Sequence, residues 1–213
     1  MYGNTTKDIP IEYGYLALIS KKINIAIIGG GRAGHIKTKA FSKRGYNVVV
    51  LSLDFINEFD AFNNKENIKL IKGYYFKEFI MDKHIVVIAI NDDLKRQEII
   101  KHCNENAKLY IDCSDFKNGL AVVPFQIESE SLICGINSRG GNPRVTRKIS
   151  EKVQAVLLEE EEFVSFSTDI RNKLKGQENF KEVMDFILED DFKFFFNNGY
   201  GKEIINMFYD NLI

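Results

Sequence analysis

Three glycines at fixed spacing, followed by one carboxylate, are the residues in this chain whose pattern most directly predicts chemistry. Gly29, Gly31 and Gly34 form the pattern Gly-x-Gly-x-x-Gly, which is typical of the turn that binds the pyrophosphate of a dinucleotide. In such a turn the first glycine permits the bend, the second lets the backbone approach the phosphates, and the third lets helix and strand pack closely. Asp54 comes twenty residues after Gly34, where a carboxylate would accept hydrogen bonds from an adenosine ribose.

The carboxylate of Asp54 also bears on which cofactor binds. It would repel a 2′-phosphate, so the pattern predicts NAD rather than NADP, although the nearby Ser52, Arg32 and Lys37 would weaken that preference. The alternative is a glycine-rich turn in a flavodoxin-like or S-adenosylmethionine-binding sheet. We expect the cofactor-binding residues to be Gly29, Gly31, Arg32, Ala33, Gly34, Ser52, Asp54, Asn91 and Asp92.

Asn91 and Asp92 join this set because of the run that precedes them. They follow the apolar residues 85–90 directly, so they would lie at the carboxyl edge of a parallel sheet, where ligands of open α/β folds bind. Asn and Asp are also favoured as helix N-caps. Both interpretations remain open.

The elements that must position these residues alternate between strand and helix. Strand-like apolar runs occur at 23–28, 47–51, 85–90 and 109–111, and helical spacing occurs at 33–43 and 94–103. This alternation predicts an α/β fold with a Rossmann-like parallel sheet. Two further strand-like runs, 120–125 and 132–137, have no helix between them, and helical spacing then continues from Val145 to the end. We expect a nucleotide-binding domain at 1–115, a small α+β dimerisation segment at 116–148 and a helical C-terminal domain at 149–213.

Composition excludes several classes of protein. With 45% hydrophobic and 28% charged residues among 213, the chain has the composition of a globular protein and not of a disordered one. A net charge of −1 provides no general field for nucleic acid or an anionic membrane, and no apolar run is long enough to span a bilayer. Three cysteines without a CxxC pair favour a reducing compartment, so we expect a cytoplasmic protein without nucleic-acid or membrane partners.

For two further groups of side chains, a structural role is the simpler interpretation. His35, His84 and His102 lack the spacing of metal ligands, so no resident metal site is predicted. The phenylalanines between 192 and 196 would form either a helical core or a partner surface, and the core is the more common outcome.

Several segments together resemble the NAD-dependent precorrin-2 dehydrogenases of siroheme synthesis, including the amino-terminal module of siroheme synthase. They occur in the family's order at 27–37, 88–93, 112–115, 122–124 and 136–147. The resemblance implies oxidation of precorrin-2 to sirohydrochlorin with NAD as hydride acceptor. Some members also insert ferrous or cobaltous ion into the product, so this chelation is a further expectation, with the metal as substrate.

The resemblance also implies site residues. The family's essential aspartate lies in a short segment that matches 112–115, which makes Asp115 the expected catalytic residue. Asp112 is the alternative, because this chain has Asp where the family usually has Asn and the linker to 122–124 is one residue shorter. A loop carboxylate that only caps a turn is the structural alternative for both.

The stretch 136–147 would contact the tetrapyrrole, a polycarboxylate that suits basic side chains and free helix N–H groups. The expected substrate-binding residues are Ser138, Asn142, Arg144 and Arg147, and a solvated helix face is the alternative for the basic ones. Family members are homodimers, and we expect residues 120–137 to form the interface. A non-catalytic NAD-binding redox sensor and a chelatase without dehydrogenase activity are the competing functions.

Overall fold

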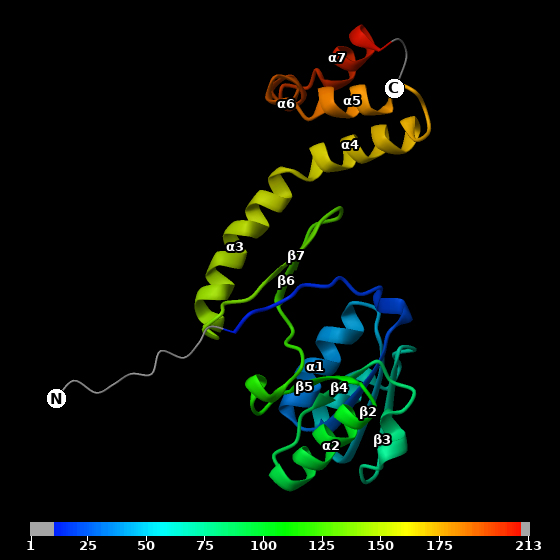
Figure 1. Ribbon diagram of the computed structural model, residues 1–213, viewed down its shortest axis with the longest axis vertical. Helices are drawn as coiled ribbons and strands as arrows, with labels where there is room; N and C mark the ends of the chain where they lie inside the picture. The colour runs from blue at the N-terminus through cyan, green and yellow to red at the C-terminus, as the bar shows by residue number, and fades with distance from the viewer. Residues whose placement is uncertain (1–10, 210–213) are drawn as a thin grey trace, which may run out of the picture. The chain divides into compact units, whose positions relative to one another are not determined.

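The computed structural model describes residues 11–209, which form two compact units (Figure 1). One unit is Gly14–Val123, and the other contains the described residues 11–13 and 124–209. The predicted division into three domains at 115 and 148 stays a prediction.

A five-stranded parallel sheet forms the first unit, in the order β3-β2-β1-β4-β5. Its elements are β1 (Asn24–Gly30), α1 (Arg32–Lys43), β2 (Asn47–Phe55), β3 (Ile68–Lys72), β4 (Ile85–Ile88), α2 (Asp93–Glu105) and β5 (Leu109–Asp112). Short 3₁₀ helices occupy Ser20–Lys22, Asn57–Phe62, Lys77–Ile80 and Phe116–Asn118. The predicted Rossmann-like parallel sheet is confirmed.

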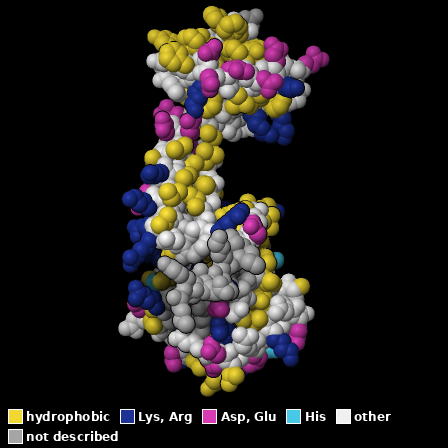
Figure 2. Space-filling view, turned by 60° about the vertical axis from the view of Figure 1, so that its left-hand side comes forward, with side chains coloured by type: hydrophobic (Ala, Val, Ile, Leu, Met, Phe, Trp, Pro, Cys, Tyr) yellow, Lys and Arg dark blue, Asp and Glu magenta, His cyan; other side chains and the backbone are white. Residues whose placement is uncertain are grey.

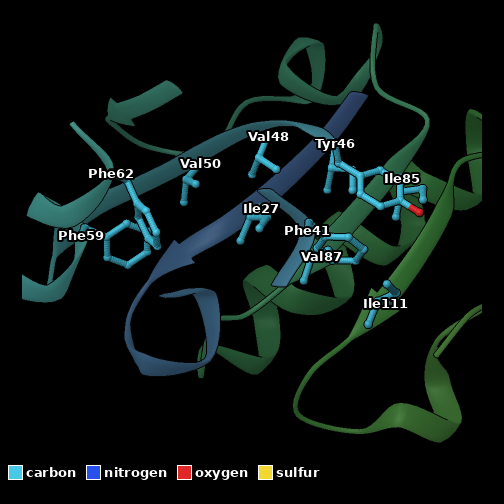
Figure 3. Close-up of a cluster of buried hydrophobic side chains, with 11 residues drawn as sticks. Ile27, Phe41, Tyr46, Val48, Val50, Phe59, Phe62, Ile85, Val87 and Ile111 are labelled. Carbon is cyan, nitrogen blue, oxygen red and sulfur yellow. The ribbon is translucent and has the colours of Figure 1, made fainter. Parts of the chain in front are cut away.

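Each face of the sheet has its own apolar core, because successive side chains of a strand point to opposite faces. On one face Ile27, Val50 and Val87 pack with Phe41 of α1 (Figure 3). On the other, the neighbouring positions in the strands pack with α2 through Ile99. Burial on both faces explains why these strands are continuous apolar runs.

The second unit pairs a hairpin with a helical region. The antiparallel strands are β6 (Phe125–Glu128) and β7 (Ile133–Ile136). The helices are α3 (Pro143–Glu159), α4 (Glu161–Leu174), α5 (Phe180–Ile187), α6 (Asp190–Asn197) and α7 (Gly201–Phe208). The expected helical C-terminal region is therefore confirmed, and the small segment before it contains an antiparallel hairpin. The phenylalanine run divides: Phe192 is buried and Phe196 packs beside it, whereas Phe194 and Phe195 are exposed.

Three strand predictions need correction, and one strand was missed. The strand expected at 120–125 is wrong, because β6 begins only at Phe125. The second strand of the sheet continues to Phe55, so Asp54 lies inside it rather than beyond it. β4 ends at Ile88, two residues earlier than expected. β3 was not predicted, because lysines interrupt its apolar residues.

Candidate functional site

The turn after β1 requires glycine at two positions for different reasons. Gly29 has a φ of +121°, and a Cβ there would meet the Ala89 carbonyl oxygen at 2.2 Å. A Cβ on Gly34, in the first turn of α1, would meet the Gly29 carbonyl oxygen at 2.0 Å. The first glycine thus permits the bend, and the third allows the close packing of helix on strand.

Gly31 differs from both, because the space around it is open. Apart from Gly31 and its chain neighbours, no described heavy atom lies within 4 Å of where its Cβ would be. Gly31 is the N-cap of α1, with no side chain capping the helix. The first N–H groups of a helix have no intrahelical partner, and together with the helix dipole they attract anionic groups such as phosphate. An exposed N-terminus without a side chain in the way fits the pyrophosphate of a dinucleotide. The adjoining Arg32 and Ala33 are also exposed.

Ser52 and Gly30 form an irregularity between β1 and β2 that the sequence analysis did not foresee. The ladder shifts register so that Gly30 pairs with Phe55. The Ser52 hydroxyl accepts a hydrogen bond from the Gly30 N–H at 2.8 Å and donates one to the Asp54 carbonyl at 2.7 Å. Ser52 therefore shapes the backbone that carries Asp54.

Gly30 itself was missing from the predicted site. A Cβ there would meet the Asp54 carbonyl oxygen at 2.3 Å, so this close approach of β2 requires glycine. The signal was the unbroken run Gly29-Gly30-Gly31, which exceeds what the Gly-x-Gly-x-x-Gly pattern demands.

The carboxylate of Asp54 is exposed and lies beside a cation. Lys72 Nζ, from the end of β3, is 2.7 Å from Asp54 Oδ1. Because exposed pairs are weak, both groups remain available to a ligand.

Three loops gather at the carboxyl edge of the sheet, and hydrogen bonds join each to its neighbour. The loop after β4 is tied to β1 because the Ala89 N–H donates to the Ile28 carbonyl at 2.8 Å. The loop after β5 is tied to β4 because the Cys113 N–H donates to the Ile88 carbonyl at 3.0 Å. β1 and β4 flank the point where the strand order reverses, which is the usual ligand crevice of open α/β sheets.

The loop after β4 combines the two interpretations left open for it. Asp92 is the N-cap of α2, and its side chain accepts a hydrogen bond from the Lys95 N–H at 3.0 Å. Asn91 and Asp92 are both exposed at this edge. Asp92 therefore caps α2 and also lies at the carboxyl edge of the sheet, so both interpretations hold for it.

Asp112 and Asp115 occupy contrasting environments. The Asp112 side chain is fully buried, and its Oδ1 accepts hydrogen bonds from the N–H groups of Ser114 at 2.9 Å and Asp115 at 3.2 Å. Asp115 is half-buried and caps the next short helix, since its Oδ1 accepts from the Lys117 N–H at 3.1 Å and its Oδ2 from the Asn118 amide at 3.1 Å. Asp112 thus holds the turn, and Asp115 is the carboxylate that a ligand could reach.

Arg96 is a further residue at this edge that the sequence analysis did not single out. Its Nη1 lies 3.0 Å from Asp112 Oδ2, and its Nη2 lies 2.8 Å from Asp93 Oδ1. The only available signal was an arginine at the i+3 position from Asp93.

In the loop after β5, burial raises the pKa of the Cys113 thiol. This effect outweighs the opposite effect of the positive charge of nearby Lys37.

The predicted substrate-binding residues lie in the second unit, around the start of α3. The Ser138 hydroxyl accepts a hydrogen bond from the Asn142 N–H at 2.6 Å, and Asn142 Oδ1 caps α3 by accepting from the Val145 N–H at 3.2 Å. Arg144 is exposed, and Arg147 lies 3.8 Å from Glu151 on the same helix. These four residues are close in sequence, but the first two are occupied with local turns.

Residues 11–209 contain neither a candidate metal-binding cluster nor a helix that could span a membrane. No group of three or more His, Cys, Asp or Glu side chains that could hold a metal ion occurs in this part of the chain. None of its helices has the length and apolar character needed to cross a membrane.

A protein-family model described as "Putative NAD(P)-binding" matches residues 16–125, which is over half of the chain. Its relatives include bacterial siroheme synthases. The chain belongs to this NAD(P)-binding family. The siroheme synthase of Salmonella dublin is 26% identical over 132 residues, or 62% of this chain and 29% of that protein. Siroheme synthase 2 of Klebsiella pneumoniae is 23% identical over 153 residues, or 71% of this chain and 33% of that protein.

The chain therefore spans about a third of the length of these siroheme synthases. Among solved structures, SirC, a precorrin-2 dehydrogenase, aligns with a TM-score of 0.65 at 21% identity and covers 83% of this chain and 90% of that one. At this identity the match shows that the two proteins share a fold.

Proposed function

We propose that this protein oxidises precorrin-2 to sirohydrochlorin with NAD as the acceptor, as a step in siroheme synthesis. The observation that carries the proposal is the meeting of the glycine turn and the Asp115 loop at one sheet edge, in a chain of an NAD(P)-binding family that is similar to siroheme synthases. The substrate class comes from the proteins it resembles, which are siroheme synthases and a precorrin-2 dehydrogenase.

The chain's own residues divide the work of cofactor binding. The N–H groups at the start of α1 would bind the pyrophosphate, since Gly31 leaves that space open. Asp54 would accept hydrogen bonds from the adenosine ribose. When bound, NAD would supply a hydride acceptor. The exposed positions of Arg32, Asn91 and Asp92 suit them to line the same cofactor.

Asp115 is the group that we propose takes the proton released when the ring loses hydride. Each of its carboxylate oxygens accepts one hydrogen bond from the chain, and a carboxylate oxygen has a second lone pair with which to accept another. A positioned carboxylate is a common general base. Asp112 is less suited, because its side chain is fully buried and paired with Arg96.

The substrate's carboxylates would bind to the start of α3, where we propose contacts with Ser138, Asn142, Arg144 and Arg147. Arginine binds carboxylates through two parallel hydrogen bonds. Asn142 caps the helix through its side chain, but the positive end of the dipole remains favourable to anions there.

We also propose a homodimer formed through the hairpin and α3. Val145, Ile149 and Val156 expose about half of their surface each, at 53%, 44% and 54%, along one side of α3. Figure 2 shows hydrophobic side chains running along this helical stretch. A second copy would remove this apolar surface from water. The proposed dimerisation segment 116–148 contains the hairpin and Val145, and Ile149 and Val156 would extend the contact beyond it.

Insertion of ferrous or cobaltous ion into sirohydrochlorin is a second activity that we propose to test. The metal would be a substrate, and Asp115 could take the displaced pyrrole protons.

The three cysteines are free thiols, which agrees with our assignment of the enzyme to the cytoplasm.

The decisive experiment is anaerobic incubation of the full chain with enzymatically generated precorrin-2, with and without NAD. Absorption of sirohydrochlorin and of NADH should rise together and only when NAD is present. Binding of NAD without any oxidation would favour a redox sensor instead. Metal insertion into added sirohydrochlorin without oxidation would identify a chelatase that lacks dehydrogenase activity.

A further inference from the structure

We infer that Arg96 is a positioning residue that holds the Asp115 loop in place through Asp112. The inference rests on the proposed function, because it takes Asp115 as the base. Arg96 lies in the first turns of α2, beside the Asn91–Asp93 segment, whereas Asp112 ends β5. The guanidinium therefore joins the two loops that flank the ligand edge at β4.

The chain of contacts from Arg96 to Asp115 has two links. Arg96 Nη1 donates to Asp112 Oδ2 at 3.0 Å. Asp112 Oδ1 then accepts from the N–H groups of Ser114 and Asp115 at 2.9 and 3.2 Å. One carboxylate thus receives the guanidinium on one oxygen and the loop backbone on the other, so the orientation of Asp112 determines where Asp115 begins.

Burial makes this dependence strong. The side chain of Asp112 has no exposed surface and that of Arg96 only 13%. A carboxylate in such surroundings needs a paired cation, because an unpaired buried charge is strongly unfavourable. Without Arg96, Asp112 would have to take up a proton or turn toward water, and either change would loosen its hold on the two N–H groups.

The shape of arginine also matters at this position. Its two terminal nitrogens reach different carboxylates, Asp112 and Asp93, and its Nε is buried with no hydrogen-bond partner among the described residues. A lysine carries the charge as a single point and does not reproduce this fork. Arg96→Lys therefore keeps the charge while removing the geometry, which makes it a milder test than deletion.

The matched control lies one position away on the same helix. Lys95 pairs with the exposed Glu98 at 2.6 Å and makes no hydrogen bond or ion pair with Asp112 in the described part of the chain. Lys95→Met should leave kcat for precorrin-2 oxidation within about twofold of wild type and should not change the fold, as is usual for surface substitutions. If Arg96→Lys folds poorly, Arg96→Met combined with Asp112→Asn replaces it in the comparison with Lys95→Met. This double variant removes both buried charges at once and so leaves neither of them unpaired.

The first readout is amide hydrogen exchange at Ser114 and Asp115 in the full chain, which needs no enzyme activity. Arg96→Lys should accelerate exchange at these two amides by about tenfold, because their acceptor becomes mobile, and Lys95→Met should not. Unchanged exchange in Arg96→Lys would overturn the inference whatever the activity.

The second readout is a double-mutant cycle with Asp115→Asn, which keeps an N-cap acceptor but removes the base. Arg96→Lys alone should lower kcat for precorrin-2 oxidation by about ten- to a hundredfold, the usual effect of small displacements of catalytic groups. The dissociation constant for NAD should stay within about twofold of wild type. In the Asp115→Asn background the same change should have almost no further effect on kcat.

The outcomes separate the two proposals. If Asp115→Asn leaves oxidation intact, the assignment of the base fails, and the role of Arg96 in catalysis falls with it. If Asp115→Asn abolishes most activity but the Arg96→Lys loss multiplies with it, the base stands and the positioning role is overturned.

Discussion

Lys72 Nζ lies 2.7 Å from Asp54 Oδ1, so the carboxylate expected to face the ribose already has a cation beside it. The pairing follows from the parallel register of β2 and β3, in which Ser52 is opposite Lys72. An isolated carboxylate at this position would repel a 2′-phosphate. We therefore expect Lys72 to offset that repulsion and to influence the choice between NAD and NADP.

We predict that Lys72→Ala weakens binding of NADP about two- to fivefold while changing NAD binding less, because exposed charge pairs contribute less than about 1 kcal/mol. Asp54→Ala should have the opposite effect on the preference. Isothermal titration of the two nucleotides measures both. Lys69→Ala, on the same strand and also exposed, is the control, and an equal loss of NADP binding there would show that only net charge matters.

The glycine turn allows a prediction that separates folding from binding. Gly31→Ala adds a methyl group in open space, so stability should be unchanged, whereas NAD binding should weaken by at least about tenfold because the methyl group keeps phosphate from the N–H groups. Gly34→Ala meets the Gly29 carbonyl at 2.0 Å and should cost about 1–3 kcal/mol of stability. Thermal unfolding and NAD titration of both variants provide the comparison, and similar behaviour of the two would contradict it.

The central strands of the sheet were predictable because strands buried on both faces must be apolar throughout. The glycine turn was predictable as well, since its spacing reflects fixed backbone requirements. β3 was not, because Lys69 and Lys72 interrupt its pattern at the exposed edge. The start of β6 was misplaced because the apolar residues before Phe125 include Val123, which packs into the sheet's core instead.

Contacts between distant residues set the limit at the site. The Gly-x-Gly-x-x-Gly spacing does not indicate that Gly30 must admit the Asp54 carbonyl. Arg96 and Asp112 are sixteen residues apart, and only the packing of α2 against the sheet brings them together. Sequence spacing identifies residues that share one turn, whereas pairs such as this one depend on tertiary structure.

Alkaline pH should destabilise the sheet unit through Cys103. Burial raises the pKa of this thiol from 9.0 to about 12, and nearby Lys108 only partly opposes the shift. The folded chain therefore retains a proton that the unfolded chain loses, so the stability is fully present below pH 9 and is lost as the pH rises toward 12. The slope reaches at most about 1.4 kcal/mol per pH unit for one group. The free energy of unfolding can be measured at several pH values by urea unfolding followed by circular dichroism. Plotted against pH, it should fall less steeply in Cys103→Ala than in wild type.

The control for that experiment is Cys134→Ala, since Cys134 lies in the hairpin of the other unit. Its slope should match that of wild type. The comparison uses slopes and not absolute stabilities, because Cys103→Ala also leaves a small cavity in the core. Equal slopes in Cys103→Ala and wild type would mean that another group governs the alkaline loss.

The exposed side of α3 provides the test of the proposed homodimer. Thr146 and Ser150 are the buried residues of this helix, whereas Ile149 is 44% exposed on a neighbouring side with Val145 and Val156. A charge at Ile149 would have to lose its hydration in any interface that covers this surface. We therefore predict that Ile149→Glu shifts the chain to a monomer in sedimentation velocity, with at least about a tenfold weaker dimer.

Glu151→Lys is the matched charge change on α3, because Glu151 faces Arg147 away from the apolar side. It should leave the sedimentation coefficient unchanged. If Ile149→Glu also leaves it unchanged and wild type is a dimer, the two copies meet through another surface. If wild type sediments as a monomer, the homodimer proposal itself is wrong, and the apolar side of α3 must be covered in some other way.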